Sequence, residues 1–589
     1  MSAITQAAVV RVPVLVVGAG PAGLAAALLL RSYGVEALTV TRYRWTAHSP
    51  RAHHINPRAM ELLRELGLER SVTAAAMPHD LIRNVTWCVS LAGEEIGRIQ
   101  TYHHGGPGGY AEYTPCEATN VPQHLLEPVM AEALLAGGGD LHFNVDCMSI
   151  EEGEDSVCAR LRNRVTGQEY VVEAQYVIGA DGANSTVAKA INLPFDGTVG
   201  WGAAVNVWMR ADLARYCAHR PGVLYWTNQP GSDFWIGSGV FISVKPWNEW
   251  MVTFMYDPKA GDFDTTPEAL IRRIHHIIGD DAVPVEILSA TKWLMNAQYA
   301  RQLSTRRVFC VGDAVHRHSP ANGLGANTSM LDSYNLAWKL RLVLQGVASP
   351  KLLETYSRER QPIGRSVVER SMKSVGEFVS IAAALGYGPG QSVAAGEEQL
   401  RTLYDPGPEG VRRRQALQRA FALQHYHFGA VGFELGYRYE SGAILDADGP
   451  MLENTDPALK YVPQTAPGCA LPHAWIESKG RQLSTLDITG HGEFHLLAGQ
   501  GADGWRRACD DIQSDTGLTI RVSTIGPGCD HADPYGQWRS VRIVGDSGCV
   551  LVRPDRHVAW RAMEAGSGAV AELTSGIRAL LAGGGRSCG

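Results

Sequence analysis

A glycine-rich run at residues 18–23, Gly-Ala-Gly-Pro-Ala-Gly, is the first feature of this sequence that can do chemistry. It fits the pattern G-x-G-x-x-G, in which the glycines allow a tight turn and let a pyrophosphate approach the backbone closely. The helix that follows such a turn presents free N–H groups and the positive end of its dipole to the anion. The pattern predicts that a dinucleotide contacts Gly18, Gly20, Pro21, Ala22 and Gly23.

The adenosine end of that nucleotide lacks its usual partner in the sequence. An acidic residue that binds the ribose is expected about 20 residues after the glycines. Thr41 and Arg42 stand there instead. A threonine hydroxyl can hydrogen-bond a ribose, and we expect Arg42 to lie against the adenine or the phosphates.

Two further segments combine a buried strand with an acid and glycines. Residues 176–182 read Tyr-Val-Ile-Gly-Ala-Asp-Gly, and residues 308–314 read Val-Phe-Cys-Val-Gly-Asp-Ala. The second segment continues through His316 and His318 to a glycine-rich stretch at 323–327. Each segment alone is equally consistent with a plain strand and turn. The two histidines could ligate a metal, but no third ligand cluster accompanies them, and we predict no metal site.

The elements around the first glycine run predict an α/β fold. Residues 12–17 are continuously apolar and β-branched, which is typical of a strand buried on both faces. A helix is expected over 21–33, Gly34 suits the position after a helix end, and 35–41 read as a second buried strand. These residues form one βαβ unit.

The pattern of apolar and aromatic residues changes after about residue 200. Aromatic-rich alternation over 201–256 predicts an antiparallel sheet with one covered face. A buried strand at 306–311 and a long helix at 327–344 return the chain to the first domain, which is therefore discontinuous. Helical periodicity over 350–425 indicates a connector, and short strands with intervening helices after 463 indicate a separate α/β domain.

Composition excludes several classes of protein. The 589 residues include 53 Lys and Arg against 60 Asp and Glu, a net charge of −7, so no nucleic-acid partner is expected. The apolar run at 12–30 has three glycines and Pro21 in its middle, which favours strand, turn and helix over a membrane span. The eleven cysteines form no C-x-x-C pair, which favours free thiols in the cytoplasm.

The three motifs together resemble those of the FAD-dependent aromatic hydroxylases, the class A flavoprotein monooxygenases, which carry a GxGxxG, a DG and a GD motif. The sequence is most similar to the phenol 2-monooxygenase branch of that family. The likeness spans nearly the whole chain, and the matching stretches are residues 42–45, 50–53, 296–299, 312–339 and 550–561.

The resemblance implies an α/β FAD-binding domain with a Rossmann-like βαβ unit, an inserted and mostly antiparallel β layer that binds substrate, and a C-terminal thioredoxin-like domain. We expect the FAD-binding domain at 1–80, 105–200 and 285–370, and the substrate layer at 81–104 and 201–284. A helical connector is expected at 371–462 and the thioredoxin-like domain at 463–589. Without C-x-x-C, that last domain should be redox-inert.

The resemblance also assigns cofactor roles. Asp313 would accept a hydrogen bond from a ribityl hydroxyl of FAD, and Asp181 would bind FAD and NADH or NADPH. Arg51 would contact the pyrophosphate and Gln123 the flavin ring. The long helix would point its positive end at flavin N1 and C2=O. The residues expected at that helix end are Pro320, Gly323, Gly325, Ala326 and Asn327.

The implied reaction is ortho-hydroxylation of a phenol by a homodimeric enzyme. NADH or NADPH reduces FAD, O2 adds at flavin C4a, and the distal oxygen of the hydroperoxide moves to the ring. Alternatives are a tailoring hydroxylase of a larger phenolic natural product, and a flavoprotein that transfers no oxygen, either a reductase or a redox sensor. A halogenase is disfavoured because W-x-W-x-I-P is absent.

His53 is the predicted catalytic residue, because the family places this segment beside the flavin ring and imidazole titrates near neutrality. The competing interpretation is a histidine that only packs. Where the branch has an acid and a base in its pocket, this chain has Asn120 and Ile242, so a different substrate is expected. The residues expected to contact substrate are Asn120, Trp226, Ile242 and Tyr299.

Overall fold

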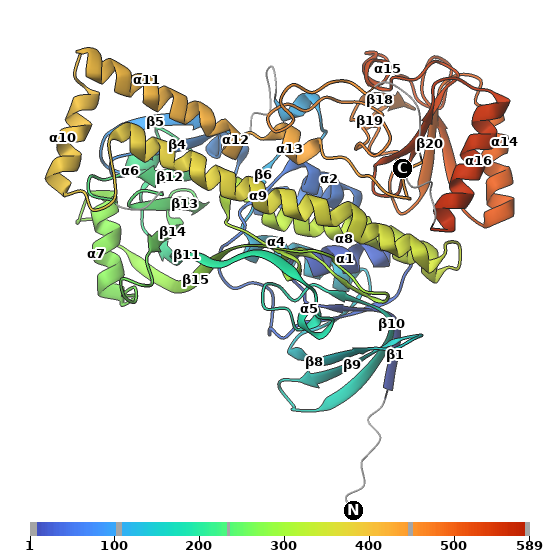
Figure 1. The fold of residues 1–589 in the computed structure, drawn as a ribbon, viewed down its shortest axis with the longest axis horizontal. Coiled ribbons are helices and arrows are strands. Elements are labelled where there is room, and N and C mark those ends of the chain that lie inside the picture. Colours follow the sequence, from blue (N-terminus) through green and yellow to red (C-terminus); the bar gives the residue numbers. More distant parts are fainter. Residues whose placement is uncertain (1–8, 102–108, 233–235, 446–450, 584–589) are drawn as a thin grey trace, which may run out of the picture.

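A computed structural model describes residues 9–101, 109–232, 236–445 and 451–583. Its first sheet has seven strands in the order β7-β2-β1-β10-β9-β8, with β16 also paired to β10 (Figure 1). The strands are β1 (Val9–Val17), β2 (Ala37–Val40), β7 (Asp140–His142), β8 (Val145–Glu152), β9 (Val157–Asn163), β10 (Glu169–Gly179) and β16 (Val308–Cys310). Strand β1 is parallel to both β2 and β10, and β10 is parallel to β16.

The predicted βαβ unit is confirmed at the start of the chain. Helix α1 (Pro21–Ser32) joins β1 to β2, with a proline in its first turn, where a missing N–H costs nothing. Gly34 follows the helix with a φ of +75°. Helix α1 packs against α4 (Gln123–Ala136) and α8 (Gly325–Leu344), and its inner face is fully apolar.

The second sheet has eight strands in the order β17-β15-β11-β14-β13-β12-β4-β5. Neighbouring strands are antiparallel except β12 and β4. The strands are β4 (Asn84–Cys88), β5 (Glu95–Gln100), β11 (Phe195–Arg210), β12 (Leu224–Thr227), β13 (Gly239–Lys245), β14 (Glu249–Tyr256), β15 (Glu286–Ala300) and β17 (His316–Arg317). One face packs on α7 (Pro267–Ile278), and the other packs on residues of α9 and α11.

Two expected domain boundaries differ from the structure. The substrate layer was expected to begin at residue 201 and end at residue 284, but the sheet extends past both boundaries. Strand β11 begins at Phe195, where it pairs with Ala300 at the end of β15. Helix α9 (Glu354–Leu385) runs unbroken through residue 370 and crosses the middle of the molecule in Figure 1. The helices that follow it are α10 (Val393–Leu403), α11 (Pro408–Leu423), α12 (His425–Phe428) and α13 (Val431–Leu435).

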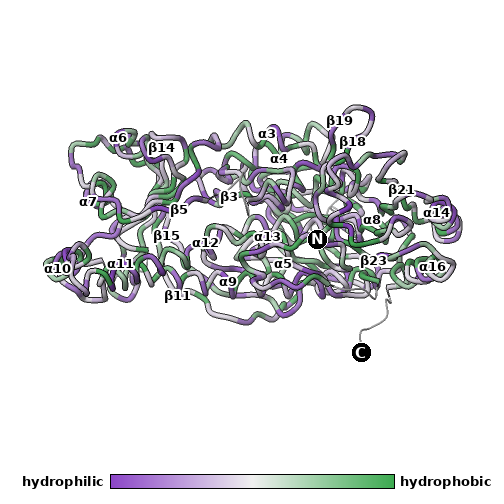
Figure 2. Tube along the Cα trace, turned by 90° about the horizontal axis from the view of Figure 1, so that it is seen from above, coloured by the Kyte–Doolittle hydropathy of each residue, from purple (hydrophilic) through white to green (hydrophobic). Residues whose placement is uncertain are grey.

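The C-terminal part has its own four-stranded sheet in the order β21-β20-β22-β23. Its elements are β20 (Phe494–Ala498), α14 (Asp503–Thr516), β21 (Ile520–Thr524), α15 (Gln537–Val541), β22 (Cys549–Val552), β23 (Val558–Ala562) and α16 (Ser567–Leu581), preceded by the hairpin of β18 (Trp475–Ser478) and β19 (Arg481–Ser484). Seen from above, α14 and α16 lie at one end of the molecule, and α7, α10 and α11 lie at the other (Figure 2).

Short elements complete the described chain. They are β3 (His54–Ile55), α2 (Pro57–Glu65), α3 (Glu69–Ala75), η1 (His79–Leu81), η2 (Tyr110–Glu112), β6 (Thr119–Asn120), α5 (Thr186–Ala190), α6 (Ala214–Cys217), η3 (Gly312–Ala314), η4 (Ala321–Gly323) and η5 (Pro350–Leu353). Within the described residues, no helix has both the length and the apolar character needed to cross a bilayer.

Candidate active site

The glycine turn between β1 and α1 has one open position. A Cβ on Gly18, whose φ is +110°, would lie 2.2 Å from the Ala180 carbonyl oxygen, and a Cβ on Gly23 would lie 1.9 Å from the Gly18 carbonyl oxygen. The nearest atom to a Cβ on Gly20 would be Glu127 Oε1 at 3.8 Å. Helix α1 has no side-chain cap, so its first N–H groups face this open position and suit an anion.

Four of the expected site residues are brought together by one strand pairing. Strand β3 pairs with β6 in antiparallel register. Beyond the strands, the Val121 N–H donates to the His53 carbonyl at 2.8 Å, and the Gln123 N–H donates to the Arg51 carbonyl at 2.8 Å. Arg51, His53, Asn120 and Gln123 therefore line adjacent strands, although about 70 residues of chain separate the two segments.

Glu127 is a residue of this region that the sequence did not single out. Its buried carboxylate accepts hydrogen bonds from the Gln123 side chain and from the Ala47 N–H. Burial raises the pKa of Glu127 despite these bonds. Arg51 is exposed, and its guanidinium makes no hydrogen bond or ion pair with the described residues. The one available signal was the spacing of Gln123 and Glu127, four residues apart on α4.

The GD segment forms a tight turn after β16. Gly312 has a φ of +62°, and a Cβ there would lie 2.7 Å from Ser329 Oγ of α8. Asp313 is exposed, and its carboxylate accepts no hydrogen bond from the described residues. Buried Asp332 of α8 stabilises the turn. Its carboxylate accepts hydrogen bonds from the Gly312 N–H and from His316 Nε2, both at 2.9 Å. His316 therefore pairs with a carboxylate, and the described residues contain no cluster of three or more metal-ligating side chains.

The start of α8 approaches β3 closely. A Cβ on Gly323, whose φ is +61°, would lie 3.0 Å from the His54 side chain. Asn327 joins the two elements, because its Oδ1 accepts from the Asn56 N–H at 2.9 Å and its Nδ2 donates to the His54 carbonyl at 3.0 Å. Helix α8 has no side-chain cap, so the N–H groups near Gly325 are left for a ligand. Pro320 is exposed and Ala326 half-buried at this end.

The DG segment uses its carboxylate locally. Asp181 accepts from Ser185 Oγ at 2.5 Å and from the N–H groups of Thr186 at 2.6 Å and Val187 at 3.3 Å. These contacts cap the start of helix α5. An acid that follows a strand can serve this structural role as well as a cofactor-binding role. Arg42 lies on the other side of the glycine turn, 3.7 Å from Asp146.

Unpartnered buried polar atoms gather beside β3 and β6. Both ring nitrogens of His53 are buried without a hydrogen-bond partner among the described residues, and so are Asn120 Oδ1 and Ser243 Oγ. The Asn120 amide donates to the Ser243 carbonyl at 3.3 Å, so these two residues touch. Burial, and then nearby His124, lower the pKa of His53 to about 3, so its imidazole is neutral at physiological pH. Buried polar atoms of this kind are satisfied by ordered water or by a ligand.

The remaining expected substrate residues lie in two places. Trp226 of β12 packs 4.2 Å from the Phe378 ring of α9, its indole nitrogen buried and unpartnered. Ile242 of β13 packs in the same apolar cluster. Tyr299 is at the far end of β15, where it pairs with His316 and faces the Arg365 guanidinium at 5.7 Å. The structure therefore does not place Tyr299 beside Trp226 and Ile242.

Comparison with known proteins agrees with this geometry. Residues 11–371 match the FAD binding domain family, and residues 464–582 match the aromatic-ring hydroxylase C-terminal domain. The chain belongs to the FAD-dependent aromatic-ring hydroxylases.

Several relatives cover almost the full length. The chain is 42% identical to a 2,4-dichlorophenol 6-monooxygenase of Cupriavidus pinatubonensis, over 98% of this chain and 97% of that protein. It is 39% identical to a phenol 2-monooxygenase of a Pseudomonas species, over 94% and 90%. Among solved structures it resembles the flavin-dependent monooxygenase PieE in complex with FAD and substrate, with a TM-score of 0.93, 44% identity, and coverage of 97% and 99%.

The residues present fit FAD, which is the cofactor of this enzyme, with NADH or NADPH as electron donor. Gly20 leaves room for a pyrophosphate at an uncapped helix start. Asp313 offers a carboxylate without a partner, and the uncapped N-terminus of α8 lies close to His54. The side-chain amide of Asn327, by contrast, is hydrogen-bonded to the backbone of Asn56 through its oxygen and to that of His54 through its nitrogen.

Proposed function

We propose that this enzyme hydroxylates a phenolic substrate at a ring carbon ortho to the phenol hydroxyl. Two observations carry the proposal: the His53 ring nitrogens are buried and make no hydrogen bond with the described residues, and the same holds for Oδ1 of Asn120 and Oγ of Ser243, two residues that touch each other. A phenol hydroxyl donates and accepts hydrogen bonds, so it can satisfy a buried polar atom of this kind. The relatives named for phenol and dichlorophenol support the same substrate class.

His53 is proposed to accept a hydrogen bond from the phenol hydroxyl, which orients the ring and assists loss of the proton. A phenol with a pKa near 10 is only about 0.1% ionised at pH 7, and the phenolate is the form whose ring carbons are electron-rich. Burial keeps the His53 imidazole neutral, with a pKa of about 3, so one ring nitrogen is free to accept a hydrogen bond. Bound FAD, once reduced by NADH or NADPH, would activate O2, of which one oxygen atom goes to the ring and the other leaves as water.

The protein must also favour charge on the cofactor and keep water away from it. The uncapped start of α8 directs N–H groups and the positive end of a 20-residue helix toward this site. The apolar cluster around Trp226, Met255 and Phe378 covers the substrate face of the eight-stranded sheet. A dry site strengthens electrostatic interactions and protects reactive oxygen from water.

A second candidate substrate is a larger phenolic natural product. The indole nitrogen of Trp226 and the hydroxyl of Tyr387 are both buried without partners in the cluster under α9. They offer hydrogen bonds to polar groups on a substrate of more than one ring. Asn120 and Ile242, standing where an acid and a base were expected, leave the pocket less polar for a small phenol.

The C-terminal domain is proposed to be thioredoxin-like and redox-inert. Its support is the order of elements: β20, α14 and parallel β21, then antiparallel β22 and β23, then α16. Burial raises the pKa of the Cys509 thiol to about 12, and it raises that of Cys549 as well. A homodimer is proposed from the family resemblance, and light scattering would distinguish 63.7 kDa from twice that mass.

One assay tests the proposed function. NADH or NADPH oxidation and O2 uptake are measured with no substrate, with phenol, with 2,4-dichlorophenol and with multi-ring phenols. A phenolic substrate should accelerate both signals and give a catechol-type product. Oxidation that no phenol accelerates, with all O2 recovered as peroxide, would contradict the proposal. Acceleration by multi-ring phenols alone would select the second candidate.

A further inference from the structure

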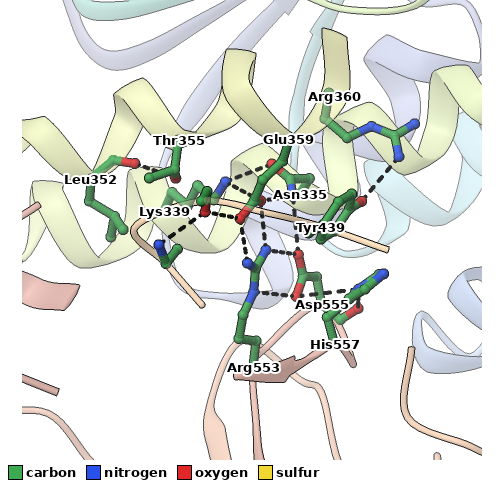
Figure 3. Close-up of polar contacts among 12 residues, drawn as sticks. Asn335, Lys339, Leu352, Thr355, Glu359, Arg360, Tyr439, Arg553, Asp555 and His557 are labelled. Carbon is green, nitrogen blue, oxygen red and sulfur yellow. Dashed lines mark hydrogen bonds and ion pairs between the residues drawn. The ribbon is translucent and has the colours of Figure 1, made fainter. Parts of the chain in front are cut away.

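A buried network of charged side chains connects the C-terminal domain to the turn that carries Asp313. Figure 3 shows its part around Glu359, Arg553 and Arg360. Its centre is Glu359 of α9, whose carboxylate accepts two hydrogen bonds from Arg553 at 2.6 and 2.9 Å. Lys339 donates to the same carboxylate at 2.7 Å. Arg553 also binds Asp555 at 2.6 Å. The side chains of Glu359, Lys339 and Arg553 are completely buried.

The next residue of α9 continues the network toward the cofactor site. Arg360 donates from Nε to Asp332 Oδ1 at 2.7 Å and from Nη1 to the Tyr439 hydroxyl at 3.0 Å. The Tyr439 ring stacks on His557 at 4.1 Å, and the Arg553 guanidinium lies 5.3 Å from its centre. Arg360 is thus bound by the Tyr439 hydroxyl as well as by Asp332 of α8.

Asp332 is the point where the network meets the Gly312 turn. Its two oxygens accept three donors: Arg360 Nε, His316 Nε2 and the Gly312 N–H. Gly312 directly precedes Asp313, and its φ of +62° brings the backbone against Ser329 of α8. A carboxylate that accepts from this N–H fixes the peptide between residues 311 and 312, directly before Asp313, whose side chain is exposed.

Charge balance explains why these groups are stable together. The network contains three cations, Arg360, Lys339 and Arg553, and three carboxylates, Asp332, Glu359 and Asp555. A buried ion pair contributes little net stability against an apolar replacement, but removing one partner leaves an uncompensated charge. Such a network therefore fixes geometry more effectively than it adds stability.

We infer that Asp332 and Arg360 are positioning residues for the Asp313 turn, and that the C-terminal domain completes their alignment through Arg553 and Glu359. The inference rests on the assignment of Asp313 to FAD. It gives the C-terminal domain a defined task in cofactor binding, although none of its residues needs to touch FAD.

The test measures the dissociation constant of FAD from apo-protein, by flavin fluorescence, together with the melting temperature of the apo-protein. Asp332→Asn should weaken FAD binding about tenfold, which corresponds to about 1.4 kcal/mol. Tyr439→Phe removes only the hydroxyl that Arg360 contacts and should weaken it about threefold. The double variant Arg553→Met with Glu359→Gln keeps the network neutral and should also weaken it.

A matched control exists at the same domain boundary. Arg64 of α2 binds Asp487 of the C-terminal part at 2.8 Å, outside the network. The double variant Arg64→Met with Asp487→Asn should lower the melting temperature and leave FAD affinity unchanged. Equal losses of affinity in control and network variants would overturn the inference, and so would wild-type affinity in Tyr439→Phe and the Arg553 double variant. If Asp332→Asn does not fold, those two variants still decide.

A failure of this inference is distinguishable from a wrong assignment of Asp313. In Asp313→Ala itself, unchanged FAD affinity would remove the assignment. Reduced affinity in Asp313→Ala with wild-type affinity in every network variant would remove only the positioning role. With saturating FAD, network variants should recover the wild-type ratio of product formed to NADH or NADPH consumed, because none of them touches the substrate.

Discussion

The carbonyl oxygen of His53 accepts a hydrogen bond from the N–H of Val121 at 2.8 Å. This bond extends the β3 and β6 pair and holds the His53 backbone independently of its imidazole. The ring nitrogens make no hydrogen bond with the part of the chain that the structure describes. Substitution of the side chain is therefore expected to change chemistry more than local structure.

His53→Ala and His53→Asn should bind FAD and consume NADH or NADPH at near wild-type rates. Oxygen transfer should fall, with the lost turnover appearing as hydrogen peroxide, because the hydrogen bond that orients the phenol and assists its deprotonation is needed only for that step. The measurement is the ratio of product to NADH or NADPH consumed, together with peroxide yield. A purely packing role predicts lower thermal stability with this ratio unchanged in both variants.

Asp313→Ala should lose FAD, since a hydrogen bond to a charged group contributes about 1.5–3 kcal/mol, equivalent to at least a tenfold loss of affinity. Its apo-protein should melt at the wild-type temperature, because the described residues donate no hydrogen bond to this carboxylate. Full flavin occupancy of the variant at micromolar protein would contradict the assignment.

Asp181→Ala should behave differently from Asp313→Ala. It removes the side chain that accepts from the Thr186 and Val187 N–H groups at the start of α5, so the apo-protein should lose about 1 kcal/mol of stability. A differential scanning measurement on apo-protein separates the two variants. An unshifted melting temperature in Asp181→Ala would show that the cap contributes nothing.

Stability should fall as the pH drops below about 6.5. Burial lowers the pKa of His427 to about 3, and the pKa of His53 is also about 3. Between these values and 6.5 the unfolded chain binds protons that the folded chain does not, so acid favours unfolding. Urea unfolding midpoints at several pH values measure the slope. His427→Phe should reduce it by up to about 1.4 kcal/mol per pH unit, and an unchanged slope would contradict the burial argument.

The full chain should not reduce insulin in the presence of a dithiol. Burial raises the pKa of Cys509 and Cys549, so neither thiol forms the thiolate that such chemistry needs. Turbidity of insulin is the readout, with thioredoxin as positive control. Turnover dependent on Cys509 would disprove the inert assignment.

Local features of this molecule followed from the sequence. The turn of Gly18, Gly20 and Gly23 could be predicted because its conformation depends on neighbouring residues and on the absence of side chains. The end of the β layer could not, because β15 is recognisable as part of it only through its pairing with β11. A strand carries its own periodicity but not the identity of its partner.

Within the site, the missed residues act over long sequence separations. Asp332 lies in the middle of a buried helix and gains its role from Gly312, 20 residues earlier. Asn327 stays a predicted cofactor contact, and its side-chain amide also joins α8 to His54 and Asn56. A family motif marks a position as important without saying whether the residue faces the ligand or supports its neighbour.

The pairing of β10 with β16 imposes an order on biosynthesis. Strand β10 leaves the ribosome with residue 179, but its parallel partner follows only at Val308–Cys310, and α8 ends at Leu344. A nascent chain shorter than this has exposed strand edges and no complete nucleotide pocket, and such contacts between distant residues form slowly. FAD can therefore bind only after most of the chain has been translated.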